Sequence, residues 1–134
     1  MNSDSSKKYY LSAAPQCPIP DESIPLEAMQ TMDFVWVQFY NNPGCNLDSP
    51  GFAASFKQWS SDLSKGGKGP QLLVGAPGCP VPQCSGSAYV DGNALGPILD
   101  GVKSAPNFGG VMLWEGSRAK KNNDFIKTVK GLLG

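Results

Sequence analysis

Four cysteines and the absence of histidine set the first limits on the chemistry of this chain. Its 134 residues include Cys17, Cys45, Cys79 and Cys84, each among prolines and glycines and none in the C-x-x-C spacing of a zinc ribbon or redox motif. Four cysteines allow three pairings, and their loop-like surroundings favour disulfides in an oxidising compartment over reduced thiols in a cytosolic protein. Without histidine, a histidine-dependent triad and a zinc site with histidine ligands are excluded, and we expect no cofactor and no bound metal.

Carboxylates are the remaining side chains that could act as acids or bases. Glu115, and the pair Asp21 and Glu22, each follow a stretch that we expect to be a strand. Carboxylates in loops are usually ordinary solvent-exposed groups. Glu115 is therefore a weak candidate for a catalytic acid.

The charge balance argues against two classes of partner. Eleven basic and eleven acidic residues cancel, and the sequence pI is near 6.1. A nucleic-acid binder or a polybasic membrane-surface protein would carry an excess of positive charge. No run approaches the ~20 apolar residues of a membrane span, and the polar N-terminus lacks the apolar run of a secretory signal. We expect no nucleic acid and no membrane among the partners.

Four stretches have the composition of β-strands: residues 9–14, 34–39, 72–76 and 111–114. The first begins with two tyrosines and ends at Pro15, the second is an almost unbroken apolar run, and the other two are flanked by Gly or Pro. Continuous apolar runs are typical of strands in parallel sheets.

Helical patterns lie between these strands, with apolar residues recurring on one face. The predicted inward-facing sets are Phe52, Phe56, Trp59 and Leu63; Leu95, Ile98, Leu99 and Val102, capped by Asp91 or Asn93; and Ile126, Val129 and Leu133, capped by Asn123. A short helix over residues 25–30 joins the first two strands. Together these predict an α/β fold of four βα units. A (β/α)₈ barrel needs about 250 residues, so spacing alone also allows a small open sheet.

Three segments carry a family resemblance: Ala-Ala-Pro-Gln-Cys-Pro at 13–18, Phe-Val-Trp-Val-Gln-Phe-Tyr-Asn-Asn-Pro at 34–43, and Gly-Gly-Val-Met-Leu-Trp at 109–114. In this order and spacing they resemble the class III, hevamine-like chitinases of glycoside hydrolase family 18. The resemblance covers residues 8–133 and implies that the four strands are the last four of a barrel. The expected fold is then a half (β/α)₈ TIM barrel, with a polar tail at 1–8 and a single half-barrel domain at 9–134.

The resemblance also implies covalent and backbone details. The family's pattern pairs Cys17 with Cys45, which leaves Cys79 to pair with Cys84. It further implies a cis peptide bond between Trp114 and Glu115, and Ile19–Pro20 is a second candidate for a cis bond.

The site residues implied by the resemblance are Gln38, Tyr40, Asn41 and Trp114. In such enzymes the tyrosine hydroxyl and the two amides surround the N-acetyl group of the sugar, and the tryptophan forms an apolar floor. A pyranose ring does present an apolar face that can stack on indole, while amides can bond its hydroxyls. Other large aromatic residues, Trp36, Phe39 and Trp59, are assigned to the core.

The catalytic motif D-x-x-D-x-D-x-E of the family, with its general acid, is absent from the sequence. The resemblance therefore predicts a protein that binds chitin or N-acetylglucosamine oligosaccharides without efficient hydrolysis. Two alternatives stay open: an active glycosidase that uses another acid such as Glu115 or completes a partner, and an interaction, effector or immunomodulatory protein with no sugar role.

An isolated half barrel exposes two strand edges, so we expect a homodimer that closes the barrel. We also expect an extracellular setting.

Overall fold

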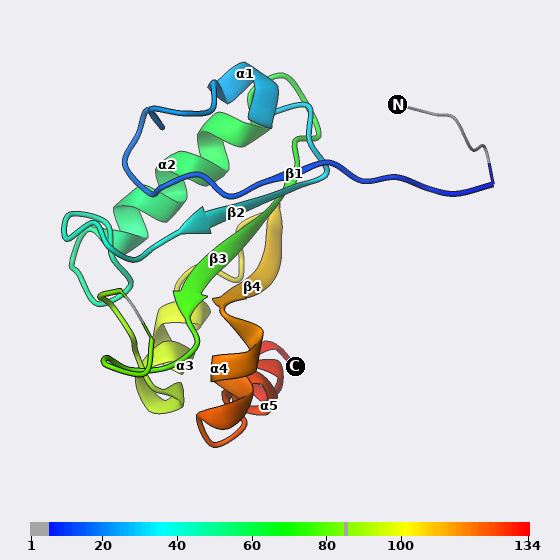
Figure 1. Ribbon diagram of the computed structural model, residues 1–134. Coiled ribbons are helices and arrows are strands. Elements are labelled where there is room, and N and C mark those ends of the chain that lie inside the picture. Colours follow the sequence, from blue (N-terminus) through cyan, green and yellow to red (C-terminus); the bar gives the residue numbers. More distant parts are fainter. Residues whose placement is uncertain (1–5, 85) are drawn as a thin grey trace.

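A four-stranded parallel sheet organises the residues that the structure describes, 6–84 and 86–134. In this computed structural model the strands lie side by side in chain order (Figure 1): β1 (Ser12–Ala13), β2 (Phe34–Gln38), β3 (Gln71–Pro77) and β4 (Phe108–Trp114). The helices are α1 (Leu26–Met29), α2 (Phe52–Ser64), α3 (Gly92–Asp100), α4 (Gly116–Lys121) and α5 (Phe125–Leu133). The predicted α/β fold of βα units with a parallel sheet is confirmed.

The two faces of the sheet are buried to different extents. On β2 the burial alternates, with Val35 and Val37 fully buried and Phe34 and Trp36 only partly buried. Successive side chains of a strand point to opposite faces. One face therefore packs against the helices, and the other, which includes Trp36, is partly open. The assignment of Trp36 to the core was wrong, because the residue lies on the open face.

Helix α2 supplies most of the cover for the buried face. Phe39, just after β2, meets Phe52 of α2 with ring centroids 4.9 Å apart. Trp59 is also buried, and its Nε1 donates a hydrogen bond to the carbonyl of Cys17 at 2.9 Å. The predicted inward positions of Phe39 and Trp59 are confirmed.

The first strand is shorter than predicted. Only Ser12 and Ala13 pair regularly with β2, opposite Phe34 and Val35. The backbone N–H of Leu11 is bonded instead to the carboxylate of Asp33, at 2.8 Å. This side-chain contact takes the donor that a longer strand would use. The segment before β1 runs away from the body of the molecule (Figure 1), and residues 1–5 of the predicted tail lie outside the described residues.

The C-terminal region differs most from the prediction. An additional helix, α4, follows β4 directly, and α5 is preceded by Asp124 with φ of 54° rather than capped by Asn123. The buried face of α5 is formed by Phe125 and Val129. Ile126 and Leu133, predicted to point inward, are 41% and 36% exposed.

Both expected disulfides are present, Cys17–Cys45 and Cys79–Cys84. The bonds Ile19–Pro20 and Trp114–Glu115 are cis, as predicted, and Val81–Pro82 is a further cis bond that the sequence did not indicate. Helix α3 begins at the predicted cap, since the carboxylate of Asp91 accepts a hydrogen bond from the backbone of Ala94 at 3.0 Å.

Candidate functional site

A cavity of about 540 Å³ opens on the partly open face, at the carboxyl ends of the strands. Its walls come from the ends of β1, β2 and β4: Ala14, Trp36, Gln38, Tyr40, Asn41, Met112, Leu113, Trp114 and Glu115. The structure thus brings together Gln38, Tyr40, Asn41 and Trp114, and it adds the weak candidate Glu115. Parallel strands end at one edge of a sheet, which is why residues far apart in sequence meet here.

A bulge in β4 sets the position of Trp114. The register shifts between Leu72 and Leu73, where the opposite strand advances from Phe108 to Gly110. Gly110 has φ of 124°, a left-handed value that a side chain would disfavour. Beyond this point Met112 lies opposite Gly75 and Trp114 opposite Pro77. Both therefore reach the cavity.

The two amides are held by neighbouring chain segments. Gln38 donates from Nε2 to the carbonyl of Ala14 at 2.6 Å, which fixes its side chain across the gap between β1 and β2. Asn41, with φ of 64°, accepts at Oδ1 from the backbone of Ser87 at 2.9 Å and donates from its own backbone to the Ser87 hydroxyl at 3.1 Å. Among the described residues, no hydrogen bond uses Gln38 Oε1 or Asn41 Nδ2. An acceptor and a donor are therefore left for a ligand.

Tyr40 is the most deeply buried of the four predicted site residues, with 4% of its surface exposed. Burial penalises the charged phenolate and raises the pKa of Tyr40 from 10.0 to about 12. The hydroxyl therefore keeps its proton at neutral pH. It can donate a hydrogen bond to a carbonyl oxygen.

Two indoles line the cavity, and they differ in what they offer. Trp114 is 55% exposed, so its ring is available as a flat apolar surface. Trp36 has a buried Nε1 with no hydrogen-bond partner in the described part of the chain. A buried polar group without a partner costs about 1–3 kcal/mol.

The carboxylate of Glu115 is surrounded by donors. Ser117 donates to Oε1 at 2.5 Å, and the Nε of Arg118 lies 3.8 Å from the same oxygen. The side chain is 46% exposed. The general acid of a glycosidase is typically a desolvated carboxyl, whereas Glu115 is solvent-exposed and bonded to Ser117.

The other predicted carboxylate, Asp21, holds its own loop together. It accepts hydrogen bonds from the backbone N–H groups of Gln16, Ser23 and Ile24, at 2.8–2.9 Å. Its neighbour Glu22 is exposed. Neither lines the cavity.

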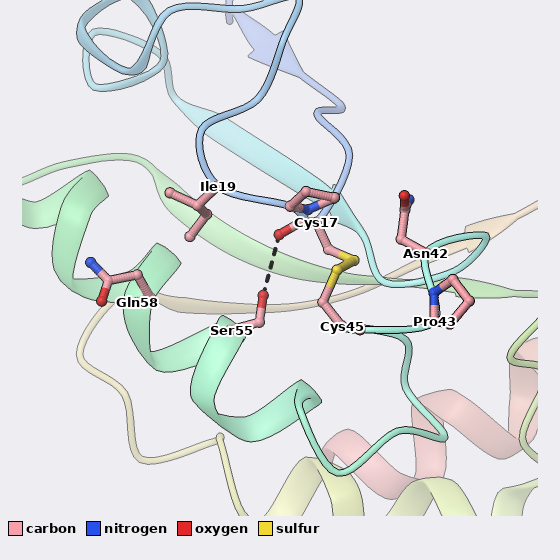
Figure 2. Close-up of a pocket in the computed structure, with 9 residues that line it drawn as sticks. Cys17, Ile19, Asn42, Pro43, Cys45, Ser55 and Gln58 are labelled. Carbon is pink, nitrogen blue, oxygen red and sulfur yellow. Dashed lines mark hydrogen bonds between the residues drawn. A yellow bond between two sulfur atoms is a disulfide. The ribbon is translucent and has the colours of Figure 1, made fainter.

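A second hollow, of about 510 Å³, lies around the Cys17–Cys45 disulfide. Figure 2 shows this bond joining the loop after β1 to the loop after β2, with Ser55 of α2 donating to the Cys17 carbonyl at 3.3 Å. The walls are mainly prolines, Ile19 and the disulfide, with no aromatic surface. The disulfide ties the two loops together, and the lining of this hollow includes none of the predicted site residues except the disulfide cysteines.

Sequence reasoning missed two contributors to the cavity. Trp36 is two residues from Gln38, and side chains two apart on a strand share a face, so that spacing was an available signal. Ser87 holds Asn41 from 46 residues away, and no local pattern indicates it.

Over the described ranges no helix is both long and apolar enough to cross a membrane, and no group of three or more Cys, Asp or Glu side chains could hold a metal ion.

Comparisons with known proteins agree with this architecture. Endochitinase 3 of Metarhizium robertsii is 46% identical over 132 residues, which is 97% of this chain and 40% of that protein. A solved chitinase from Ipomoea carnea superposes with a TM-score of 0.78 and 31% identity, covering 96% of this chain and 46% of the other. A tamarind chitinase-like lectin superposes with a TM-score of 0.77 and 26% identity, covering 95% of this chain and 46% of the other. No family model matches the chain.

Parallel βα units with a cavity at their carboxyl ends place the protein in the (β/α)₈-barrel class. Within that class the chain is homologous to the class III chitinases of glycoside hydrolase family 18, and it has the sequence and fold of one part of such a protein. It spans less than half the length of these relatives.

The raised pKa of Tyr40 can be tested without a ligand. Because its pKa is about 12 in the folded chain and 10.0 without burial, its contribution to stability is complete below pH 10 and is lost as the pH rises towards 12. We expect phenolate absorbance to show a step near pH 12 that is missing in Tyr40→Phe. The free energy of unfolding should also fall less steeply over this pH range in the variant. A difference titration between the two proteins centred at pH 10 would contradict this.

Proposed function

We propose that the chain is a chitinase-like protein that binds chitin or N-acetylglucosamine oligosaccharides in this cavity without hydrolysing them efficiently. One observation carries the proposal. The exposed indole of Trp114 lines the same cavity as the side chains of Gln38, Tyr40 and Asn41. An apolar platform beside polar groups suits a ligand that has both an apolar ring face and a carbonyl oxygen, as an N-acetylated sugar does.

The remaining polar groups of the cavity could bond the polar groups of such a sugar. A sugar ring stacked on Trp114 would share the cavity with Tyr40, whose neutral hydroxyl can donate to the carbonyl oxygen of an N-acetyl group. Gln38 Oε1 can accept from a sugar hydroxyl, and Asn41 Nδ2 can donate to one. Since both amides are already held by the backbone of neighbouring segments, they lose little conformational entropy on binding. This arrangement supports binding of a short oligosaccharide.

Efficient hydrolysis is not part of the proposal, because the chain lacks a suitable acid. The family's D-x-x-D-x-D-x-E motif does not occur in the sequence. Glu115, the carboxylate among the described lining residues, is 46% exposed and accepts a hydrogen bond from Ser117. General acid catalysis is worth about 10²–10⁴ in rate. The solved neighbour described as a chitinase-like lectin is in line with a sugar-binding role.

The proposed setting is extracellular, and the proposed partner besides sugar is a second copy of the chain. Two disulfides in 134 residues suit an oxidising compartment. A second copy would close the open side of the sheet, on which the cavity has only half of a barrel wall. We also propose that residues 9–134 act as one half-barrel domain.

Replacement of Trp114 by Ala tests the sugar platform. Loss of the stacking surface should weaken chitotetraose binding, measured by isothermal titration calorimetry, by about tenfold or more, while Trp114→Phe keeps part of the affinity. The matched control is Val81→Ala, another exposed apolar residue that is 66% exposed and lies outside the cavity lining. Unchanged affinity in Trp114→Ala would refute the proposed site. Absence of binding to the unmodified protein would favour an interaction protein with no sugar role.

Hydrolysis is tested with a fluorogenic chito-oligosaccharide. We expect no release of the fluorophore above that of buffer, because Glu115, the carboxylate among the described lining residues, is 46% exposed. If release is observed and disappears in Glu115→Gln, the enzymatic alternative is correct and the carboxylate is its acid. Release that persists in Glu115→Gln would point to an acid outside the cavity and would equally contradict the proposal.

A further inference from the structure

A smaller pocket, of about 310 Å³, lies outside the candidate site, between helix α4 and the loop that the Cys79–Cys84 disulfide closes. Figure 1 shows α4 beyond the carboxyl end of β4. The side chains that line the pocket come from both segments: Cys79, Pro80, Gln83, Arg118, Lys121 and Asn122. Two of these lining residues are cationic and none is acidic. The pocket is therefore positively charged.

The walls of the pocket are fixed by close packing and by hydrogen bonds. Gly78, just before the disulfide loop, packs so tightly against α4 that a Cβ there would lie 2.8 Å from the Cβ of Ala119. Asn122, at the end of α4, donates from Nδ2 to the carbonyl of Gly78 at 3.1 Å and to the hydroxyl of Tyr89 at 3.0 Å. These contacts hold α4 against the loop. The pocket is therefore formed before a ligand binds.

The two cations of the pocket have donors to spare. Lys121 makes no ion pair within the described part of the chain, whereas its neighbour Lys120 is bonded to Asp124 at 2.6 Å. The Nε of Arg118 lies 3.8 Å from Oε1 of Glu115, which is beyond hydrogen-bond distance. A guanidinium has five N–H donors and an ammonium has three. Both groups can therefore bond an anion.

The pocket also offers neutral polar groups. Both amide hydrogens of Asn122 are used, but no hydrogen bond within the described residues uses its Oδ1 or the side-chain amide of Gln83. A hydroxyl group can donate to one and accept from the other. The volume is about ten times the ~30 Å³ that a water molecule occupies in the liquid, so a bare inorganic ion would not fill the pocket. A ligand with one anionic group and several hydroxyls fits both observations.

We infer that this pocket binds an acidic sugar, with its carboxylate or sulfate group on Arg118 and Lys121 and its hydroxyls on the amides of Gln83 and Asn122. Glu115 competes with the ligand, since its carboxylate lies 3.8 Å from the same guanidinium. The inference goes beyond the proposed function, because it names a second site with a charged ligand. It does not require sugar binding in the cavity of Trp114.

The test is an NMR titration of the full chain with glucuronate, glucose 6-sulfate and glucose at constant ionic strength. We expect saturable shifts of the Gln83 side-chain amide and the Arg118 Nε–H signal with at least one of the two anions, and none with glucose. Binding of one anion alone assigns the ligand as a carboxylate or a sulfate. The variant Arg118→Gln/Lys121→Gln should weaken the binding about tenfold or more. Glu115→Gln should strengthen it, because the competing carboxylate is removed.

The matched control is Lys127→Gln/Lys130→Gln, which removes the same charge from exposed lysines of α5 outside the pocket lining. It should leave the affinity unchanged. The inference is overturned by no saturable shift with either anion, by equal shifts with glucose, or by equal weakening in the control. Chitotetraose added to the same samples keeps the two proposals apart. Anion binding without a response of the Trp114 indole contradicts only the proposed function, and the converse contradicts only this inference.

Discussion

Helices cover this sheet on one side only. Val35, Val37 and their neighbours on β3 are fully buried under α2 and α3, whereas Phe34 and Trp36 on the other face keep part of their surface exposed. A sheet gains stability by burying apolar area on its faces. The open face buries less of its apolar area than the covered face and therefore contributes less to stability. The cavity and the unpartnered indole of Trp36 both belong to this side.

The covered side of the sheet forms the scaffold, and the open side carries the candidate site. The Cys17–Cys45 disulfide fixes the loop after β1 to the loop after β2, and the hydrogen bond from Trp59 to Cys17 fixes it to α2 on the covered side. From this anchored layer the strand ends project Gln38, Tyr40 and Asn41 towards the open side. The loop that holds Ser87 then fixes Asn41 from a third direction. The site residues are therefore positioned before any ligand arrives, which lowers the entropic cost of binding.

Much of the fold could be predicted where local pattern and packing coincide. The apolar runs of β2 and β3 and the stripe of Phe52, Phe56 and Trp59 mark elements that are buried within the chain itself. The family resemblance supplied the disulfide pairing and the site residues, which spacing alone would have left open. Trp36 and Ile126 were misplaced for a common reason: an apolar residue was assumed to be covered, and covering depends on what lies beside the half barrel. The helix α4 and the left-handed Asp124 were missed because short elements after a strand carry little periodicity.

The central claim is that the open face binds an N-acetylated sugar on the exposed indole of Trp114. Nitrogen-15 NMR of the three tryptophan indoles, Trp36, Trp59 and Trp114, tests it most directly. On addition of chitotetraose, the account predicts a shift of the Trp114 indole resonance as a sugar ring stacks on the exposed indole. The Trp59 indole should not move, because it is buried and bonded to Cys17. An unchanged Trp114 resonance at saturating sugar would contradict the claim.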